Sequence, residues 1–97
     1  MRVSFDAYVL DTLMRDLIGH DRSPSAYLVY LTLWRRTGGR RRRAAALSHR
    51  ELAEETGLSK SAVQSALRLL TRRKLVGSRR ASPTAIPEYT VLKPWAR

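Results

Sequence analysis

The stretch ELAEETGLSKSAVQSALRLL, residues 51–70, contains two helical patterns separated by a corner. Ser48 and Glu51 have the spacing of a capping box, in which each side chain accepts a hydrogen bond from the backbone N–H of the other residue. This pair marks the start of a helix. Gly57 marks its end, because glycine readily adopts the left-handed backbone that follows a last helical turn. The pattern therefore predicts a helix over residues 49–56.

A second helix is predicted directly afterwards, over residues 60–73. Ser59 is placed to cap it, since a serine hydroxyl at this position accepts a hydrogen bond from a backbone N–H of the first turn. Leu58 can fill the corner, and the two helices together span residues 48–73. Apolar side chains at positions i, i+3, i+4 and i+7 form one stripe that we expect to be buried. Its members are Val63, Ala66, Leu67 and Leu70.

Two further helices are predicted earlier in the chain. Residues 7–18 carry apolar side chains at helical spacing, with Asp6 expected to cap the helix and Gly19 and the polar segment HDRS (residues 20–23) expected to end it. Residues 24–37 follow a cap at Ser23 and begin with proline, whose missing N–H costs nothing in the first turn. This second helix is apolar nearly all round. It therefore lies at the centre of the core or is shared between the core and a partner.

Short strands are predicted around and after the helix pair. The segments LVGSRR (residues 75–80) and EYTVL (residues 88–92) have the composition of strands and are joined by a proline-containing loop. A very short third strand is expected at AAAL, residues 44–47. The fold class is thus α+β and mainly helical, with a three-helix core, an additional N-terminal helix and a β-hairpin of two to three strands over residues 75–92. We interpret residues 1–97 as one domain, because this length suits a single core.

The spacing of a small residue, a glycine and an aliphatic residue matches the helix-turn-helix motif. Ala53 permits close approach of the two helices, Gly57 makes the turn, and Val63 contacts the core. With the strands that follow, residues 23–92 resemble the winged helix-turn-helix domains of bacterial transcription regulators of the MarR and GntR type. The segment LSKSAVQSALRLLTRRKLV carries most of this resemblance, which implies a recognition helix followed by a wing. Lys74 departs from the pattern, since such families often place glycine before the first wing strand.

Positive charge is concentrated in the later part of the chain. The net charge is +11, but residues 1–34 contain three Arg and four Asp, which gives 3 − 4 = −1. Residues 35–97 contain 16 basic and four acidic residues, which gives 16 − 4 = +12. This excess favours a polyanionic partner. Nucleic acid is favoured over a membrane surface, because the basic part lacks an amphipathic helix with bulky exposed apolar side chains.

The candidate DNA contacts lie outside the buried stripe of the second helix and on the wing. In the usual docking mode this helix enters the major groove, where glutamine can pair with adenine and arginine with guanine. The candidate DNA-binding residues are Ser59, Lys60, Ser61, Gln64, Ser65, Arg68, Arg72, Arg79 and Arg80. The last two are adjacent on a strand, so at most one of them is expected to face DNA. Phosphate repels carboxylates, so Glu51, Glu54 and Glu55 are expected to point away from DNA or to pair with Arg50.

No set of residues indicates chemistry. The absence of cysteine excludes a disulfide, a thiolate zinc site and a cysteine nucleophile. His20 and His49 lack metal-ligand spacing and are interpreted as surface residues. Neither a glycine-rich phosphate loop nor a nucleophile–base signature is present. We therefore expect no enzymatic activity, no catalytic residue, no cofactor and no bound metal.

Sequence-specific binding to double-stranded DNA is the predicted function, in a cytoplasmic, nucleoid-associated bacterial transcription regulator. We expect a homodimer formed through the N-terminal helices. No membrane or small-molecule partner is indicated: Asp6 and Asp11 interrupt any signal-peptide core, and the longest apolar run, residues 26–34, is too short to cross a bilayer. A plasmid replication or partition protein and a protein-binding winged helix stay open as alternatives. The roles of Arg40–Arg43 and Trp95 also stay open.

Overall fold

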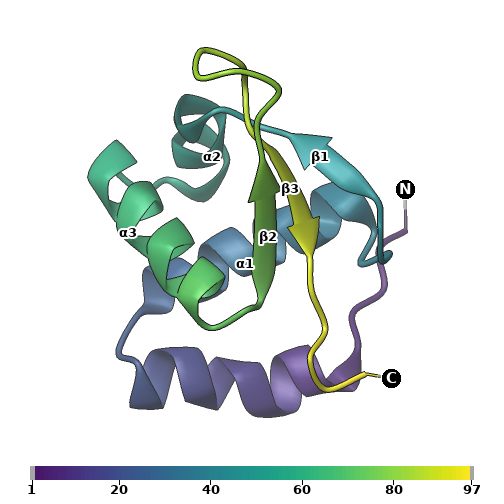
Figure 1. Ribbon diagram of the computed structural model, residues 1–97. Coiled ribbons are helices and arrows are strands. Elements are labelled where there is room, and N and C mark those ends of the chain that lie inside the picture. The colour runs from purple at the N-terminus through teal and green to yellow at the C-terminus, as the bar shows by residue number, and fades with distance from the viewer. Residues whose placement is uncertain (1, 97) are drawn as a thin grey trace.

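Two helices that meet at Gly57 form the helix-turn-helix of the computed structural model, which describes residues 2–96 (Figure 1). They are α2 (His49–Thr56) and α3 (Lys60–Arg72). The predicted bounds are reproduced to within one residue. Gly57 has a φ of +77°, which is the left-handed backbone expected at the break.

Both predicted caps are present. The Ser48 hydroxyl accepts from the N–H of Glu51 at 3.0 Å, and the Glu51 carboxylate accepts from the N–H of Ser48 at 3.1 Å. The Ser59 hydroxyl accepts from the N–H of Ala62 at 3.1 Å. The two helix starts are therefore stabilised by hydrogen bonds between residues close in sequence.

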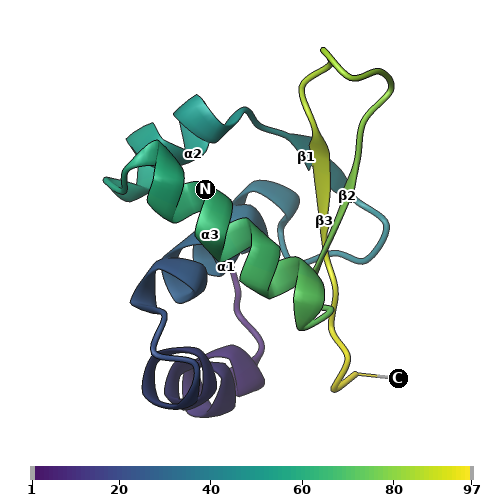
Figure 2. The same cartoon turned by 60° about the vertical axis from the view of Figure 1, so that its left-hand side comes forward.

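The helix α1 (Pro24–Thr37) runs through the centre of the core. It begins after the predicted cap at Ser23 and ends at Gly38, which has a φ of +69°. Its buried residues form one broad face: Ala26, Tyr27, Val29, Tyr30, Leu33, Trp34 and Thr37. The helices α2 and α3, the sheet and the N-terminal helix all pack against it (Figures 1 and 2). The helix therefore takes the central place in the core that one of the two interpretations predicts, while Leu28 on its opposite side is exposed.

The sheet has three antiparallel strands, β1 (Ala44–Ala46), β2 (Val76–Arg79) and β3 (Glu88–Val91), in the order β1-β3-β2. The short alanine strand therefore joins the hairpin, and the sheet has three strands where two to three were predicted. Tyr89 pairs with Ala45 on one side and Ser78 on the other. Its buried ring marks the face of the sheet that packs inward. The fold is thus the α+β winged helix-turn-helix that the sequence predicts.

The N-terminal helix differs from the prediction in its end and in its type. It consists mainly of two π-helical stretches, η1 (Val9–Leu13) and η2 (Arg15–His20), in which the turns are wider than in an α-helix. The helix passes Gly19 and ends at His20, two residues beyond the predicted bound but within the polar segment HDRS (residues 20–23) that was expected to end it together with Gly19. A glycine inside a helix lowers its propensity but does not stop it, and the wide turns are continued by a hydrogen bond from the Asp21 N–H to the Asp16 carbonyl. Among residues 2–96, no helix is both long and apolar enough to cross a membrane.

Ion pairs tie this helix to distant parts of the chain. Asp6, which was expected to cap the helix, instead lies 3.3 Å from the Lys93 ammonium. Beyond the end of α3, the Arg73 guanidinium donates to Asp16 at 2.7 Å and also to Asp21. The hydrogen bond with Asp16 and the charges of both carboxylates raise the pKa of Arg73, although burial acts against them. The N-terminal helix is thereby held against the C-terminal end of α3.

The tail of the chain packs back onto the domain. The Trp95 ring stacks on Tyr8 with 4.4 Å between centroids. Lys93 lies 4.6 Å above the ring of Trp34, on which Phe5 also stacks. Of the two roles left open for Trp95, packing on the domain is the observed one.

Replacing Arg73 by alanine is expected to lower the free energy of unfolding by about 1–2 kcal/mol, because two carboxylates then lose their common partner. The Arg73 side chain is 32% exposed, so solvent screens part of the interaction. Chemical denaturation followed by circular dichroism measures the change. Arg72→Ala is the matched control, since Arg72 is exposed and its loss should change stability by no more than about 0.5 kcal/mol. Equal losses in the two variants would contradict the role assigned to Arg73.

Candidate nucleic-acid interface

The outward face of α3 is polar and basic along its whole length. The stripe of four apolar residues predicted to face inward is buried. The exposed residues of α3 are Lys60, Ser61, Gln64, Ser65, Arg68, Thr71 and Arg72. Since α3 contains no acidic residue, this face offers hydrogen-bonding groups and positive charge without a compensating carboxylate.

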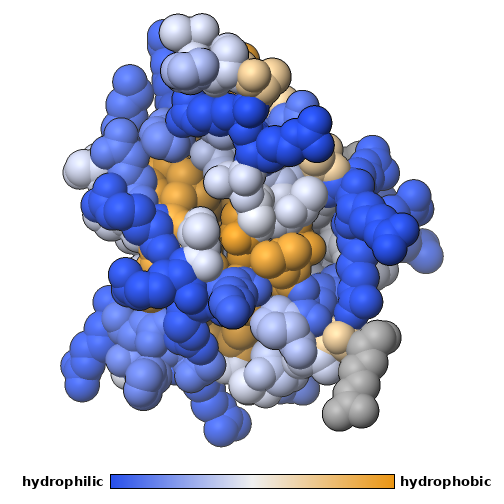
Figure 3. Space-filling view, viewed as in Figure 1, coloured by the Kyte–Doolittle hydropathy of each residue, from blue (hydrophilic) through white to orange (hydrophobic). Residues whose placement is uncertain are grey.

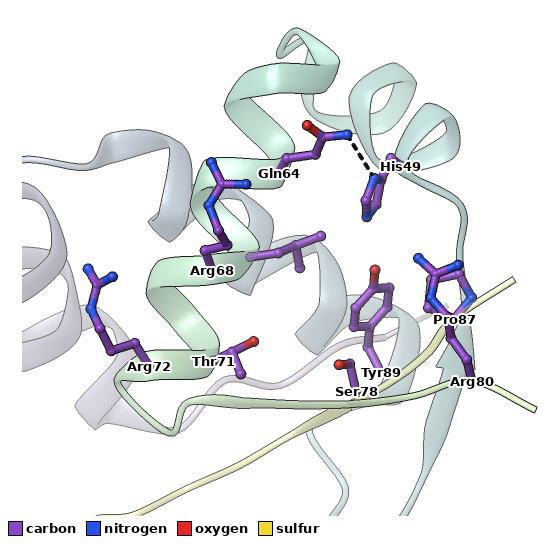
Figure 4. Close-up of a pocket in the computed structure, with 10 residues that line it drawn as sticks. His49, Gln64, Arg68, Thr71, Arg72, Ser78, Arg80, Pro87 and Tyr89 are labelled. Atoms are coloured by element: carbon purple, nitrogen blue, oxygen red, sulfur yellow. Dashed lines mark hydrogen bonds between the residues drawn. The ribbon is translucent and has the colours of Figure 1, made fainter. Parts of the chain in front are cut away.

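A hollow of about 790 Å³ lies between α3 and the wing (Figure 4). Its lining consists of His49, Gln64, Leu67, Arg68, Thr71, Arg72, Ser78, Arg80, Pro87 and Tyr89. These side chains come from α2, α3 and both long strands of the wing, so the hollow requires the wing to fold beside α3. No acidic residue is among them.

The adjacent wing arginines separate onto opposite faces of the sheet. Ser78 is the cross-strand partner of the inward-facing Tyr89, and side chains alternate along a strand, so Arg80 shares this inner side. Arg80 accordingly lines the hollow beside α3. Arg79 pairs with Glu88 in the register and faces the outer side of the sheet. The geometry thus allows one of the two arginines to accompany α3, and that one is Arg80.

The remaining predicted contacts lie at the start of α3 or beside the hollow. The Ser59 hydroxyl is engaged in the cap and lies 3.2 Å from the hydroxyl of Ser61. Lys60 and Arg80 line a smaller hollow of about 270 Å³ under the wing loop. Ser65 is exposed and accepts a hydrogen bond from Arg68 at 3.1 Å. The structure therefore gathers Gln64, Arg68, Arg72 and Arg80 at one hollow, with Lys60 next to it.

A comparison with protein families bears on the class of this interface. The model of a family described as "Helix-turn-helix domain" matches residues 23–76, from the cap of α1 to the first residue of β2, which is more than half of the chain. The chain belongs to this helix-turn-helix family. Membership identifies a DNA-binding domain of a generally non-enzymatic kind, but it does not single out the MarR or GntR type. The searches of curated proteins and of solved structures found no match.

Two residues of this helix-turn-helix interface were not expected from the sequence. His49 begins α2 and lies with its Nδ1 3.5 Å from the Nε2 of Gln64. Burial lowers the pKa of His49, and the charges of Arg80 and Lys60 lower it further. Tyr89 lies between the wing and α3, as Figure 4 shows. The alternation of β3 indicates that Tyr89 faces inward, but no local pattern indicates that the wing brings it and Arg80 beside His49.

The acidic residues of α2 are turned to structural uses. Glu51 completes the capping box. Glu54 pairs with Arg50 at 3.1 Å, which is the pairing expected from the sequence for these glutamates. Glu55 pairs with Arg36 at 2.9 Å and also with Arg35. The helix preceding α3 therefore brings no unpaired glutamate to the hollow.

Lowering the pH is expected to weaken folding through His49. The pKa of His49 is depressed in the folded domain, below its ordinary value of 6.5. As the pH falls through 6.5, the unfolded chain therefore binds a proton before the folded one, and the free energy of unfolding decreases until the folded pKa is passed. His49→Gln removes this contribution, so its stability should vary less with pH in that window. Urea unfolding at a series of pH values measures it, and parallel profiles for the two proteins would contradict the expectation.

Proposed function

We propose that this protein binds double-stranded DNA sequence-specifically and acts as a transcription regulator. The observation that carries the proposal is the outward face of α3, where Gln64 and Arg68 share with Arg80 a hollow that no carboxylate lines. An α-helix fits the major groove of B-form DNA, and these side chain types are suited to read base edges there. We assign this regulator to a bacterial cytoplasm, in association with the nucleoid.

Each side chain has a role set by its place on the interface. Gln64 and Arg68 lie near the middle of α3 and are assigned to adenine and guanine, with Ser61 and Ser65 beside them. Basic groups at the two ends of the face and on the wing are assigned to phosphates, and the N-terminus of α3 adds backbone N–H groups. The phosphate contacts are Ser59, Lys60, Arg72 and Arg80. Gln64 gives up only a long hydrogen bond, 3.5 Å to His49, when it turns to a base.

Replacing Gln64 or Arg68 by alanine is expected to weaken binding to the preferred site by about 1–3 kcal/mol each, because a bidentate base contact is lost. Affinity for random duplex should change little. The preferred site is first selected from a random duplex pool, and both DNAs are then titrated by fluorescence anisotropy at two salt concentrations. A steep loss of affinity with salt is expected for a protein that contacts several phosphates.

Arg2→Ala is the control for these variants, since Arg2 is an exposed arginine that precedes the N-terminal helix and does not line the hollow beside α3. It should leave both affinities unchanged. Equal losses on selected and random DNA would argue against base reading by α3. Absence of duplex binding at low salt would overturn the proposed function.

We further propose that two copies pair through the N-terminal helix. Its inner apolar side chains face the core, whereas Leu10, Met14 and Ile18 form a second stripe with exposures of 50%, 41% and 38%. Asp11 and Arg15 flank this stripe, so an antiparallel two-fold pairing sets opposite charges against each other. Residues 1–34 are also the part of the chain without a positive excess, which limits repulsion between copies. The dimer presents two α3 helices to a palindromic site.

Leu10→Glu is expected to convert the dimer to a monomer, because a two-fold contact would bury two like charges. The position is exposed, so the stability of the monomer should change by only about 0.5 kcal/mol. Sedimentation equilibrium measures the mass of both proteins. Ile86→Glu is the control, since Ile86 is an exposed apolar residue of the wing loop. A monomeric native protein, or an unaltered dimer of Leu10→Glu, would contradict this interface.

A further inference from the structure

The four arginines that connect α1 to β1 divide between two hollows away from α3. A turn closed by a 3.3 Å hydrogen bond from the Arg43 N–H to the Arg40 carbonyl sets them on different sides. Arg40 and Arg43 line a hollow beside the end of α1. Arg41 and Arg42 line another hollow, of about 550 Å³, together with Lys74 from the turn before β2. The second hollow lies over the outer face of the wing sheet.

Small side chains make the outer face of the sheet shallow. Gly77 and Thr90 are opposite each other in the register, and a Cβ at Gly77 would lie 2.9 Å from the Thr90 hydroxyl. Ala44 continues this flat surface on β1, opposite Thr90. Arg42 and Arg79 stand beside it and line a hollow of about 370 Å³. A hydroxyl at the centre and guanidinium groups around it suit the oxygen atoms of phosphates.

Positive charge on this surface is largely uncompensated. We call the surface formed by Arg41, Arg42, Lys74 and Arg79 the outer basic face. Among residues 2–96, none of these four takes part in an ion pair. One acidic residue, Glu88, lines the smaller of the two hollows, and Lys93, which lines the larger, forms an ion pair with Asp6. The outer basic face therefore attracts a polyanion independently of α3.

Two of its cations stand on left-handed backbone. Arg42 has a φ of +67° and Lys74 a φ of +57°, a region in which glycine is unstrained and long side chains are disfavoured. Packing does not explain the choice of residue, since both side chains are exposed. Arg22 has the same kind of backbone, with a φ of +55°, but lies between η2 and α1, outside this surface.

We propose that the outer basic face binds the phosphate backbone of a second DNA duplex, so that one protomer can hold two duplexes together. In the sheet, α3 packs beside β2, whereas the arginine loop precedes β1 at the opposite edge. Figure 1 shows α3 and this loop on opposite sides of the sheet, and hydrophilic side chains cover both sides in the space-filling view (Figure 3). A straight duplex held by α3 and Arg80 therefore does not reach Arg41 and Arg42. The inference rests on the proposed function for the first duplex.

The chemistry of the surface favours a duplex over a single strand. Single-stranded nucleic acids are held by aromatic rings on which bases stack. No aromatic side chain lines the two hollows of the outer basic face. Guanidinium, ammonium and hydroxyl groups contact backbone phosphates without regard to sequence. The second duplex is therefore bound without sequence preference and with strong dependence on salt.

The test measures bridging separately from single-duplex binding. A biotin-tagged duplex carrying the site selected by α3 is fixed to beads, the full chain is added, and capture of a fluorescent duplex of random sequence is measured at low salt. The native protein should capture the second duplex. The double variant Arg42→Gly with Lys74→Gly should bind the tagged duplex within about twofold of the native affinity and capture the second about tenfold less well, since two phosphate contacts are lost.

The glycine variants are chosen so that misfolding cannot imitate the effect. Glycine suits both left-handed positions, so thermal unfolding of the double variant should match or exceed that of the native protein. Arg22→Gly removes one charge from the same kind of backbone elsewhere and should capture DNA like the native protein. Undiminished capture by the double variant would overturn the proposal, and would be expected if bridging arose only from the two α3 helices of a dimer.

Two other results would also be decisive. Saturated single-duplex binding with no capture by the native protein overturns the outer basic face but leaves the proposed function intact. Failure to bind any duplex overturns both. If polyglutamate displaces the fluorescent duplex as well as unlabelled DNA does at equal charge, the surface fits an acidic polypeptide and the assignment to DNA is wrong.

Discussion

The burial of α1 is the constraint on which the rest of the structure depends. Three of its aromatic side chains carry a polar atom into the core, and each such atom costs about 1–3 kcal/mol if it lacks a hydrogen-bond partner. All three donate to main-chain carbonyls of the terminal segments: Tyr27 to Val9 at 2.9 Å, Tyr30 to Leu92 at 3.2 Å, and Trp34 to Ser4 at 2.7 Å. Burial raises the pKa of Tyr30, with a smaller effect from the charge of Asp6, so its phenol remains a donor. The segments before and after the helix-turn-helix therefore complete the core.

This closed core sets the position of the wing relative to α3. Leu75, two residues after the C-cap of α3, is buried, and its N–H donates to the Leu70 carbonyl at 2.9 Å. The Leu75 carbonyl in turn accepts from the N–H of Leu92 at 2.9 Å, so the base of the hairpin is anchored on both strands. Lys74 makes the left-handed turn between α3 and this anchor. Side chains from Leu75 onward point alternately to the two faces of the sheet. The placement of Arg80 beside α3 is therefore set by the few residues that anchor the start of β2 at the end of α3.

The parts of this fold that were predictable are those fixed by neighbours in sequence. The capping box at Ser48, the corner at Gly57 and the buried stripe of α3 depend on spacings of a few residues, and the structure has all of them. The end of the N-terminal helix was predicted two residues too early, because Gly19 signals a stop only locally. That helix continues to a contact between Asp21 and Arg73, 52 residues apart. The hollow beside α3 was predictable in its α3 residues and in one wing arginine, but not in His49 and Tyr89, because the pairing that brings them to it joins distant segments.

The same long-range pairing explains how the charge is distributed. Of the eight acidic residues, five form ion pairs within residues 2–96 and a sixth, Glu51, caps α2; the five are Asp6, Asp16, Asp21, Glu54 and Glu55. All of these ion pairs except that of Glu54 with Arg50 inside α2 include a contact between separate elements of the fold, and most of the net charge of +11 is left on α3, the wing and the arginine loop. In a domain with a radius of gyration of 12.6 Å this excess opposes the compact state through self-repulsion. A polyanion that binds the folded surface removes the repulsion and adds binding energy, so the charge that weakens the isolated domain stabilises its complex. Two neighbouring arginines show both uses of positive charge. Arg73 pairs with Asp16 and Asp21 within the fold, while Arg72 lies on the outward face of α3.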